Sequence, residues 1–114
     1  MRVVEVGDEL VLASVPAVET RLVAAIETGA QAVVIDLSGC EFLDSSGLAM
    51  LVRAQRRLHE HQRLALVVPH RIVRRAFEAA RLDTIFAIHP TREAALEQRR
   101  DALTGTPAQD GFRG

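Results

Sequence analysis

The chain has few aromatic residues and no lysine. Of its 114 residues, four are Phe and none is Tyr or Trp. Proteins that stack nucleic-acid bases need aromatic side chains, and this sequence has few to offer for that mode of binding. All 14 basic residues are Arg. The absence of Lys excludes a Schiff base, a Lys general base and the Gly-rich phosphate loop that ends in Gly-Lys.

Cysteine, net charge and long apolar runs are also scarce. The single cysteine, Cys40, excludes an intramolecular disulfide and a multi-thiolate metal site within one chain, and suits a reducing compartment. The net charge of −1 provides no long-range field to recruit nucleic acid or an anionic membrane. Glu5 and Asp8 interrupt the N-terminal apolar stretch, which therefore does not read as a signal peptide. No apolar run approaches the ~20 residues that span a bilayer. We expect a cytoplasmic protein that binds neither nucleic acid nor membrane.

Length and periodicity predict one α/β domain. Apolar runs bounded by turn residues predict strands over residues 2–6, 9–13, 31–36, 64–68 and 84–88. Cap residues and apolar spacing predict helices over residues 14–29, 46–61, 71–81 and 90–102. Strands that alternate with helices imply crossovers onto a single-layer mixed, mostly parallel β-sheet with about four helices. We expect a domain over 1–103 and a flexible tail over 104–114.

Local sequence also predicts how the first strands connect, where the first helix begins and ends, and which faces of the next two helices are buried. The first two strands flank Gly7-Asp8, and either a hairpin or one bent strand fits the pattern. Ser14 is expected to cap the first helix, and Gly29 to end it. Apolar spacing assigns the inward faces of the second and third helices to Leu48, Leu51, Val52, Gln55 and Leu58, and to Ile72, Val73, Ala76, Phe77 and Ala80.

The sequence offers little support for an enzyme. A nucleophile elbow needs Gly two places before the serine, and Leu43 stands there relative to Ser45. His59 and His61 are two residues apart, so on a helix they would point to different faces. We therefore expect no catalytic residues, no metal site and no cofactor. A hydrolase-like role would be revived if His70 or His89 lay within hydrogen-bond reach of Ser45.

The most informative segment is Asp44-Ser45-Ser46-Gly47, which follows an apolar strand and opens an amphipathic helix. The first N–H groups of a helix are unpaired and favour anions, so a hydroxyl here is either a plain cap or a phosphoacceptor. Gly47 lies in the first helical turn, where it costs roughly 0.5–1 kcal/mol relative to Ala. A close approach by a partner's backbone or a nucleotide would account for it. The apolar residues Phe42, Leu43 and Leu48 are suited to form a docking rim.

A resemblance to a known family is carried by the segment DLSGCEFLDSSGL, from Asp36 to Leu48. It resembles the signature of STAS domains, specifically of bacterial anti-sigma factor antagonists, and the similarity extends from about Val3 to about Ala102. The chain departs from the family at a Gly-Glu-Leu-Asp-like segment before the first helix. An ungapped match puts Val11 where the family carries that Asp, and a gapped match deletes the segment.

The resemblance implies that Ser45 is phosphorylated by a partner that is both anti-sigma factor and Ser/Thr kinase, with ATP or ADP held by the partner. The unphosphorylated chain would bind that partner, and a phosphatase would reset the switch. Asp44 would orient the Ser45 hydroxyl. The docking surface would comprise Glu41, Phe42, Asp44, Ser46, Gly47 and Leu48. The alternative is a scaffold or transporter-associated STAS domain without a phospho-switch.

Overall fold

The computed structural model describes residues 1–97. Its main sheet has four strands in the order β1-β3-β5-β6, and every neighbouring pair is parallel. The strands are β1 (Arg2–Glu5), β3 (Ala32–Asp36), β5 (Arg63–Val67) and β6 (Ala87–His89). All five residues of β3 are buried, as expected for a strand covered on both faces. The predicted mostly parallel α/β sheet is confirmed.

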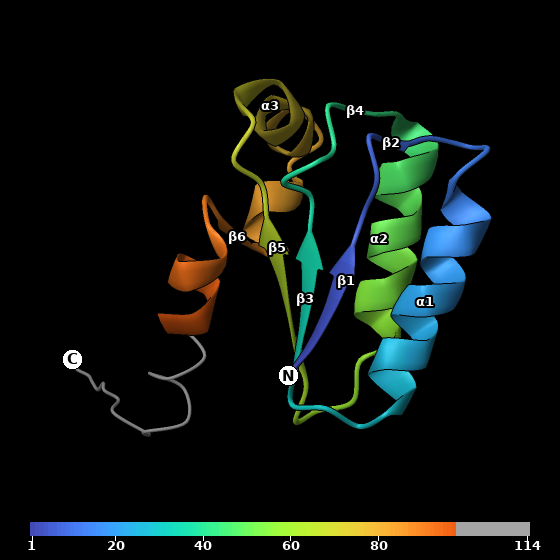
Figure 1. Ribbon diagram of the computed structural model, residues 1–114, viewed down its shortest axis with the longest axis vertical. Helices are drawn as coiled ribbons and strands as arrows, with labels where there is room; N and C mark the ends of the chain where they lie inside the picture. The colour runs from blue at the N-terminus through green and yellow to red at the C-terminus, as the bar shows by residue number, and fades with distance from the viewer. Residues whose placement is uncertain (98–114) are drawn as a thin grey trace.

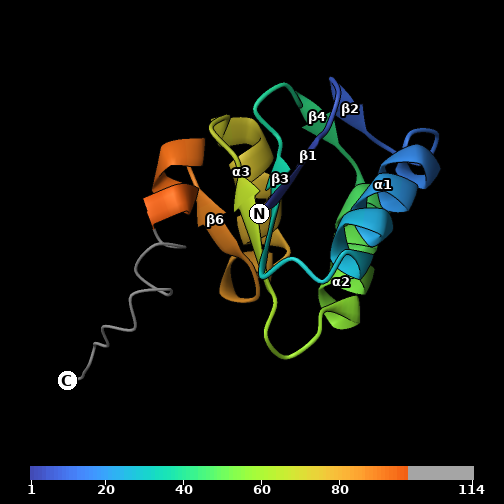
Figure 2. The ribbon, with the colours of Figure 1, turned by 60° about the horizontal axis from the view of Figure 1, so that its bottom comes forward.

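The helices cover both faces of this sheet. Helices α1 (Val15–Glu27) and α2 (Ser45–Arg57) lie side by side on one face (Figure 1). Helix α3 (Arg71–Ala79) contributes Val73 and Phe77 to the same large core. Residues 92–97 are helical and place Ala95 in a smaller cluster with Val34 and Val67 on the other face (Figure 2). The predicted continuation of this helix to Ala102 and the predicted tail over 104–114 lie outside the described residues.

The first two strands form neither a hairpin nor one bent strand. β1 pairs with β3, whereas β2 (Glu9–Leu10) pairs in parallel with a strand that was not predicted, β4 (Phe42–Leu43). The prediction that the second strand reaches Ala13 is wrong. A turn follows Leu10, in which the Ser14 N–H donates to the Val11 carbonyl at 2.9 Å.

Several helix boundaries and faces also differ from the prediction. α2 ends at Arg57, four residues early, because the backbone at Leu58 is extended. Its most buried stripe is Gly47, Met50, Leu51 and Ala54, whereas Leu48, Val52, Gln55 and Leu58 are only half-buried. On α3, Ile72 is 77% exposed and Ala80 is exposed, so the inward face is narrower than predicted. The last strand begins at Ala87 because Leu82–Thr84 form a short 3-10 turn, η1.

Arg92 attaches the last described helix to the sheet. Its Nε donates to the Asp36 carboxylate at the end of β3, and a terminal nitrogen donates to Glu5 at the end of β1. Burial acts to raise the pKa of Asp36, but hydrogen bonds from Ser38 and Arg92 outweigh it and lower that pKa. The buried carboxylate is therefore held ionised by the groups around it.

Candidate functional site

The Asp44–Gly47 segment lies at the carboxyl end of the main sheet, where the parallel strands β1, β3 and β5 all terminate (Figure 1). After β3 the chain turns through residues 37–41, runs through β4 and enters α2. Two backbone bonds extend the β2–β4 pairing, from Glu41 N–H to the Asp8 carbonyl at 2.9 Å and from Asp44 N–H to the Leu10 carbonyl at 3.2 Å. The entry to α2 is thereby fixed against the N-terminal segment. Ligand sites of open α/β sheets lie at this end of the strands.

Asp44 is the N-cap of α2. Its Oδ1 accepts from the Ser46 N–H at 2.9 Å and from the Gly47 N–H at 3.2 Å. Its Oδ2 accepts from the Leu12 N–H at 3.4 Å, across 32 residues of sequence. The sequence-based expectation that Asp44 orients the Ser45 hydroxyl is not met, because within the described residues its carboxylate bonds only to backbone N–H groups. It fixes the helix start and the loop after β2 instead.

Ser45 is the first residue of α2, and its side chain is exposed. Within residues 1–97 its hydroxyl makes no hydrogen bond, because Asp44 carries the cap. The hydroxyl lies at the positive end of the helix dipole, which favours an anion. The exposed position therefore permits approach by an outside enzyme.

Gly47 is buried, and the close approach that it makes is to its own chain. A Cβ on Gly47 would meet the Leu10 carbonyl oxygen at 2.6 Å and the Leu10 Cγ at 2.9 Å. The expectation that close approach by a partner or a nucleotide accounts for this glycine is therefore wrong, because close packing against Leu10 accounts for it. Gly47 is required by the packing of α2 against β2, and it offers almost no surface to another molecule.

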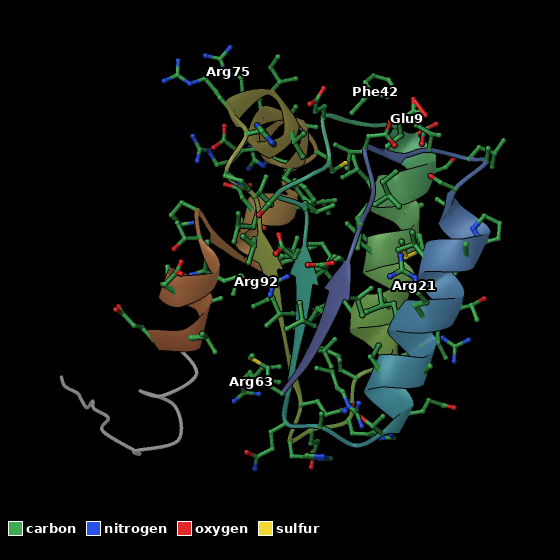
Figure 3. All side chains as sticks on the ribbon, viewed as in Figure 1. Glu9, Arg21, Phe42, Arg63, Arg75 and Arg92 are labelled. Atoms are coloured by element: carbon green, nitrogen blue, oxygen red, sulfur yellow. The ribbon has the colours of Figure 1, made fainter. Side chains whose placement is uncertain are left out.

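The other predicted partner-binding residues divide into an exposed and a half-buried set. Phe42 is 55% exposed and Glu41 is exposed, so both are accessible from β4 and the turn before it. Ser46 and Leu48 are half-buried, and Leu48 packs against the core. Phe42 and Glu9 are neighbours across the β2–β4 pair and lie at the same end of the molecule (Figure 3).

Sequence reasoning missed Leu12, which is 72% exposed and is held beside the site by its N–H bond to Asp44. The sequence pattern predicts Leu12 to be part of the second strand, and no local signal ties it to Asp44. Val11, where an ungapped match misses the family's Asp, is half-buried, and its N–H donates to the Ser14 hydroxyl at 2.9 Å. Leu12 and Phe42 together give the site an exposed apolar flank.

The remaining reactive groups of the described region do not form a catalytic constellation with Ser45. Cys40 is fully buried, and burial raises the pKa of its thiol. The Nε2 of His70 lies 2.7 Å from the Ser38 carbonyl oxygen, and neither His70 nor His89 bonds to Ser45. Across residues 1–97, no three His, Cys, Asp or Glu side chains are grouped to hold a metal ion.

Comparison with known proteins identifies the architecture. The family model described as STAS domain matches residues 1–95. The chain belongs to the STAS domain family. It is 30% identical over 103 residues to the anti-sigma-F factor antagonist RsfB of Mycobacterium tuberculosis (strain H37Rv), covering 90% of this chain and 79% of that protein. The names of such relatives describe regulators of other proteins, in agreement with the prediction that this chain is not an enzyme.

Solved structures share this fold. The crystal structure of an anti-sigma factor antagonist from Mycobacterium paratuberculosis superposes with a TM-score of 0.83 at 34% identity, covering 87% of this chain and 85% of that one. The phosphorylated form of the Bacillus cell fate determinant SpoIIAA shares the fold, with a TM-score of 0.62 at 24% identity over 84% of this chain and 87% of that one. In the described part of the chain, every helix is too short or too polar to cross a membrane.

Proposed function

We propose that this STAS domain is an anti-sigma factor antagonist controlled by phosphorylation of Ser45. In its unphosphorylated form it binds an anti-sigma factor with Ser/Thr kinase activity in the cytoplasm, and transfer of a phosphate from the partner's ATP to Ser45 releases it. A phosphatase restores the binding form, so transcription is regulated by exchange of partners. The chain needs no cofactor of its own. The names of RsfB and of the anti-sigma factor antagonist from Mycobacterium paratuberculosis support this proposal.

One observation carries the proposal: Asp44 caps α2 and leaves the adjacent Ser45 hydroxyl exposed. A serine at the N-cap position would itself be engaged with the helix backbone, but Ser45 lies one residue inside the helix. Here the structural role is filled by the neighbouring carboxylate, so modification of Ser45 removes no hydrogen bond from the described fold. We expect phosphorylation to leave the fold intact and to act on the partner.

The electrostatic effect on a partner is large enough for a switch. A phosphoserine carries about −1.5 to −2 charges at neutral pH. A like charge ~5 Å away across an interface, at an effective dielectric of ~20, costs about 3 kcal/mol per unit pair, which is roughly two decades of affinity. The partner's nucleotide phosphates or an interface carboxylate would supply that charge. The exposed Glu41, Phe42 and Leu12 would form the surrounding docking surface.

The proposal is tested with the ATP-binding anti-sigma factor kinases encoded by the source genome. Each is incubated with the chain and ATP, and the intact mass is measured; we expect a gain of one phosphate by the wild type and by Ser46→Ala, and none by Ser45→Ala. Binding is then measured with ADP-loaded kinase. We expect Ser45→Ala to bind like the wild type and Ser45→Asp to bind roughly 100-fold more weakly.

Two results would contradict the switch. Equal binding by the wild type and Ser45→Asp would show that charge at this position does not control the complex. Failure of every kinase to modify the chain, with binding intact, would favour the alternative of a STAS scaffold or transporter-associated domain without phosphorylation.

A further inference from the structure

The outer face of α3 combines positive charge with an exposed aliphatic side chain. Arg71 and Arg75 are one helical turn apart, and Ile72 lies three positions before Arg75 on the same face. All three are exposed, Ile72 to 77%. The opposite face is anchored in the core by Val73 and Phe77. The α3 outer face, defined as Arg71, Ile72 and Arg75, is therefore rigidly presented and covered by nothing in residues 1–97.

The guanidinium groups of this face are not neutralised within the described chain. The ion pairs formed by residues 1–97 all involve Arg53 or Arg92. Arg74 is half-buried on the flank of α3, and Arg81 is exposed just after it. Glu78 is the only acid on the helix, and it is ion-paired with no arginine there. The face is thus positively charged overall.

The α3 outer face lies at the same end of the molecule as the Ser45 surface. α3 packs against β4, which carries Phe42. Arg75 projects from one side of this end, and Phe42 and Glu9 lie on the other side (Figure 3). The exposed charges on the β2–β4 pair and the residues just before it have the opposite sign; we call this set the acidic rim, which consists of Asp8, Glu9 and Glu41. One end of the molecule therefore carries a negative region on β2–β4 and a positive region on α3, which packs against β4.

We propose that the α3 outer face is the second half of the docking surface, and that it selects an anti-sigma partner with an acidic patch around an aliphatic pocket. This inference rests on the proposed function. A protein partner can match both signs at once, with basic groups toward the acidic rim and acidic groups toward α3. A phosphate polymer or an anionic membrane would be repelled by the acidic rim, and the net charge of −1 offers no compensation. Ile72 fits a protein pocket that excludes water.

The test compares two charge-reversal variants that change net charge equally. The first is Arg71→Glu with Arg75→Glu; the control is Arg21→Glu with Arg56→Glu, on exposed positions of α1 and α2. Association with the ADP-loaded anti-sigma factor that binds the wild type is followed at low and high salt. We expect the α3 variant to associate about tenfold more slowly at low salt and to lose most of its salt dependence, and the control to change less than about twofold. Ile72→Ser should raise the dissociation rate.

The remaining outcomes separate this inference from the proposed function. If the α3 variant binds like the wild type while Ser45→Asp does not bind, the inference is overturned and the phospho-switch stands. If both charge reversals slow association equally, only net charge matters and α3 is not a docking element.

Sedimentation that shows a wild-type dimer dispersed by the α3 variant would assign the face to a second copy. Binding to duplex DNA or phosphatidylglycerol vesicles that this variant abolishes would assign it to a polyanion. If no anti-sigma factor binds the wild type, both proposals fail.

Discussion

The first turns of α1 and α2 use serine in opposite ways. Both helices begin with N–H groups that have no partner inside the helix. Ser14 occupies the N-cap position of α1, but its hydroxyl makes no cap bond; it accepts from the Val11 N–H and donates to the Glu9 carbonyl at 3.0 Å. Ser45 follows a capping aspartate and keeps an exposed hydroxyl. A serine is available for modification where its neighbour satisfies the backbone, and is unavailable where it does so itself.

The largest expected loss of stability comes from adding a side chain at Gly47, in the first turn of α2. In Gly47→Ala the new Cβ would lie 2.6 Å from the Leu10 carbonyl oxygen, a backbone atom that cannot rotate away. Overpacking typically costs 1–3 kcal/mol, and a clash this close with a backbone atom belongs at the upper end of that range; the higher helix propensity of Ala recovers at most about 1. We expect a net loss of about 2 kcal/mol in urea unfolding. Gly7→Ala is the matched control, because nothing lies within 4 Å of its Cβ position; equal stability of the two variants would contradict the packing argument.

Removal of the α2 cap should have the next largest effect. Asp44→Ala leaves the N–H groups of Ser46 and Gly47 without their acceptor and frees the Leu12 N–H. We expect the free energy of unfolding to fall by about 1–2 kcal/mol, the usual range for loss of a cap. Asp44→Asn retains an acceptor oxygen and should lose only a few tenths of a kcal/mol. If Asn proves as damaging as Ala, the cap is not what Asp44 contributes.

The two serines themselves give the most direct test of the comparison. Ser14→Ala removes the acceptor of the part-buried Val11 N–H and should cost about 1 kcal/mol. Ser45→Ala removes an exposed hydroxyl without a bond in the described fold, so stability should change by less than about 0.5 kcal/mol. Thermal unfolding of both variants at one pH measures the difference. A loss at Ser45 as large as that at Ser14 would show that the Ser45 hydroxyl has a structural role.

The smallest expected effect concerns a second aspartate at this end of the sheet, Asp36, and the pH dependence of stability. Burial alone would raise the pKa of Asp36, but the hydrogen bonds from Ser38 and Arg92 outweigh burial, so the pKa in the folded protein is below its ordinary value. Its contribution to stability is therefore present above the unfolded pKa of about 3.9 and is lost as pH falls through the folded value. Arg92→Gln should be less stable than the wild type near pH 7, and the gap in melting temperature should narrow below about pH 4. A gap that is constant with pH would exclude this linkage.

Local patterns predicted the region around the site well. The buried run before Asp36 and the start of a helix beside the two serines follow from residue types close together in sequence, and the structure has them at those positions. The local pattern does not decide whether Asp44 or a serine caps the helix, and the structure assigns the cap to Asp44. The site's surroundings were not predictable in this way. Gly47 is required because a side chain there would clash with Leu10, and the long-range hydrogen-bond donor to Asp44 is Leu12. Each of these residues is more than thirty positions away in the sequence.

The same limit explains the errors in the elements. A two-residue strand such as β4 has no periodicity of its own and exists because β2 lies beside it. On α3, hydrophobic spacing predicts Ile72 to face inward, but only Val73 and Phe77 are fully buried, with Ala76 packed against the core beside them. Whether an apolar residue at the edge of a helix face is buried depends on which element the fold packs against it. That depends on the whole chain and not on the local spacing.

The carboxylate of Asp44 has one oxygen on the start of α2 and the other on the backbone at Leu12, 32 residues earlier. Under the proposed function, the kinase would therefore recognise a composite surface assembled by folding, not a linear peptide motif. An unfolded or damaged copy that lacks the bond from Leu12 to Asp44 would carry the same tetrapeptide without this geometry. Recognition would then be restricted to the folded molecule.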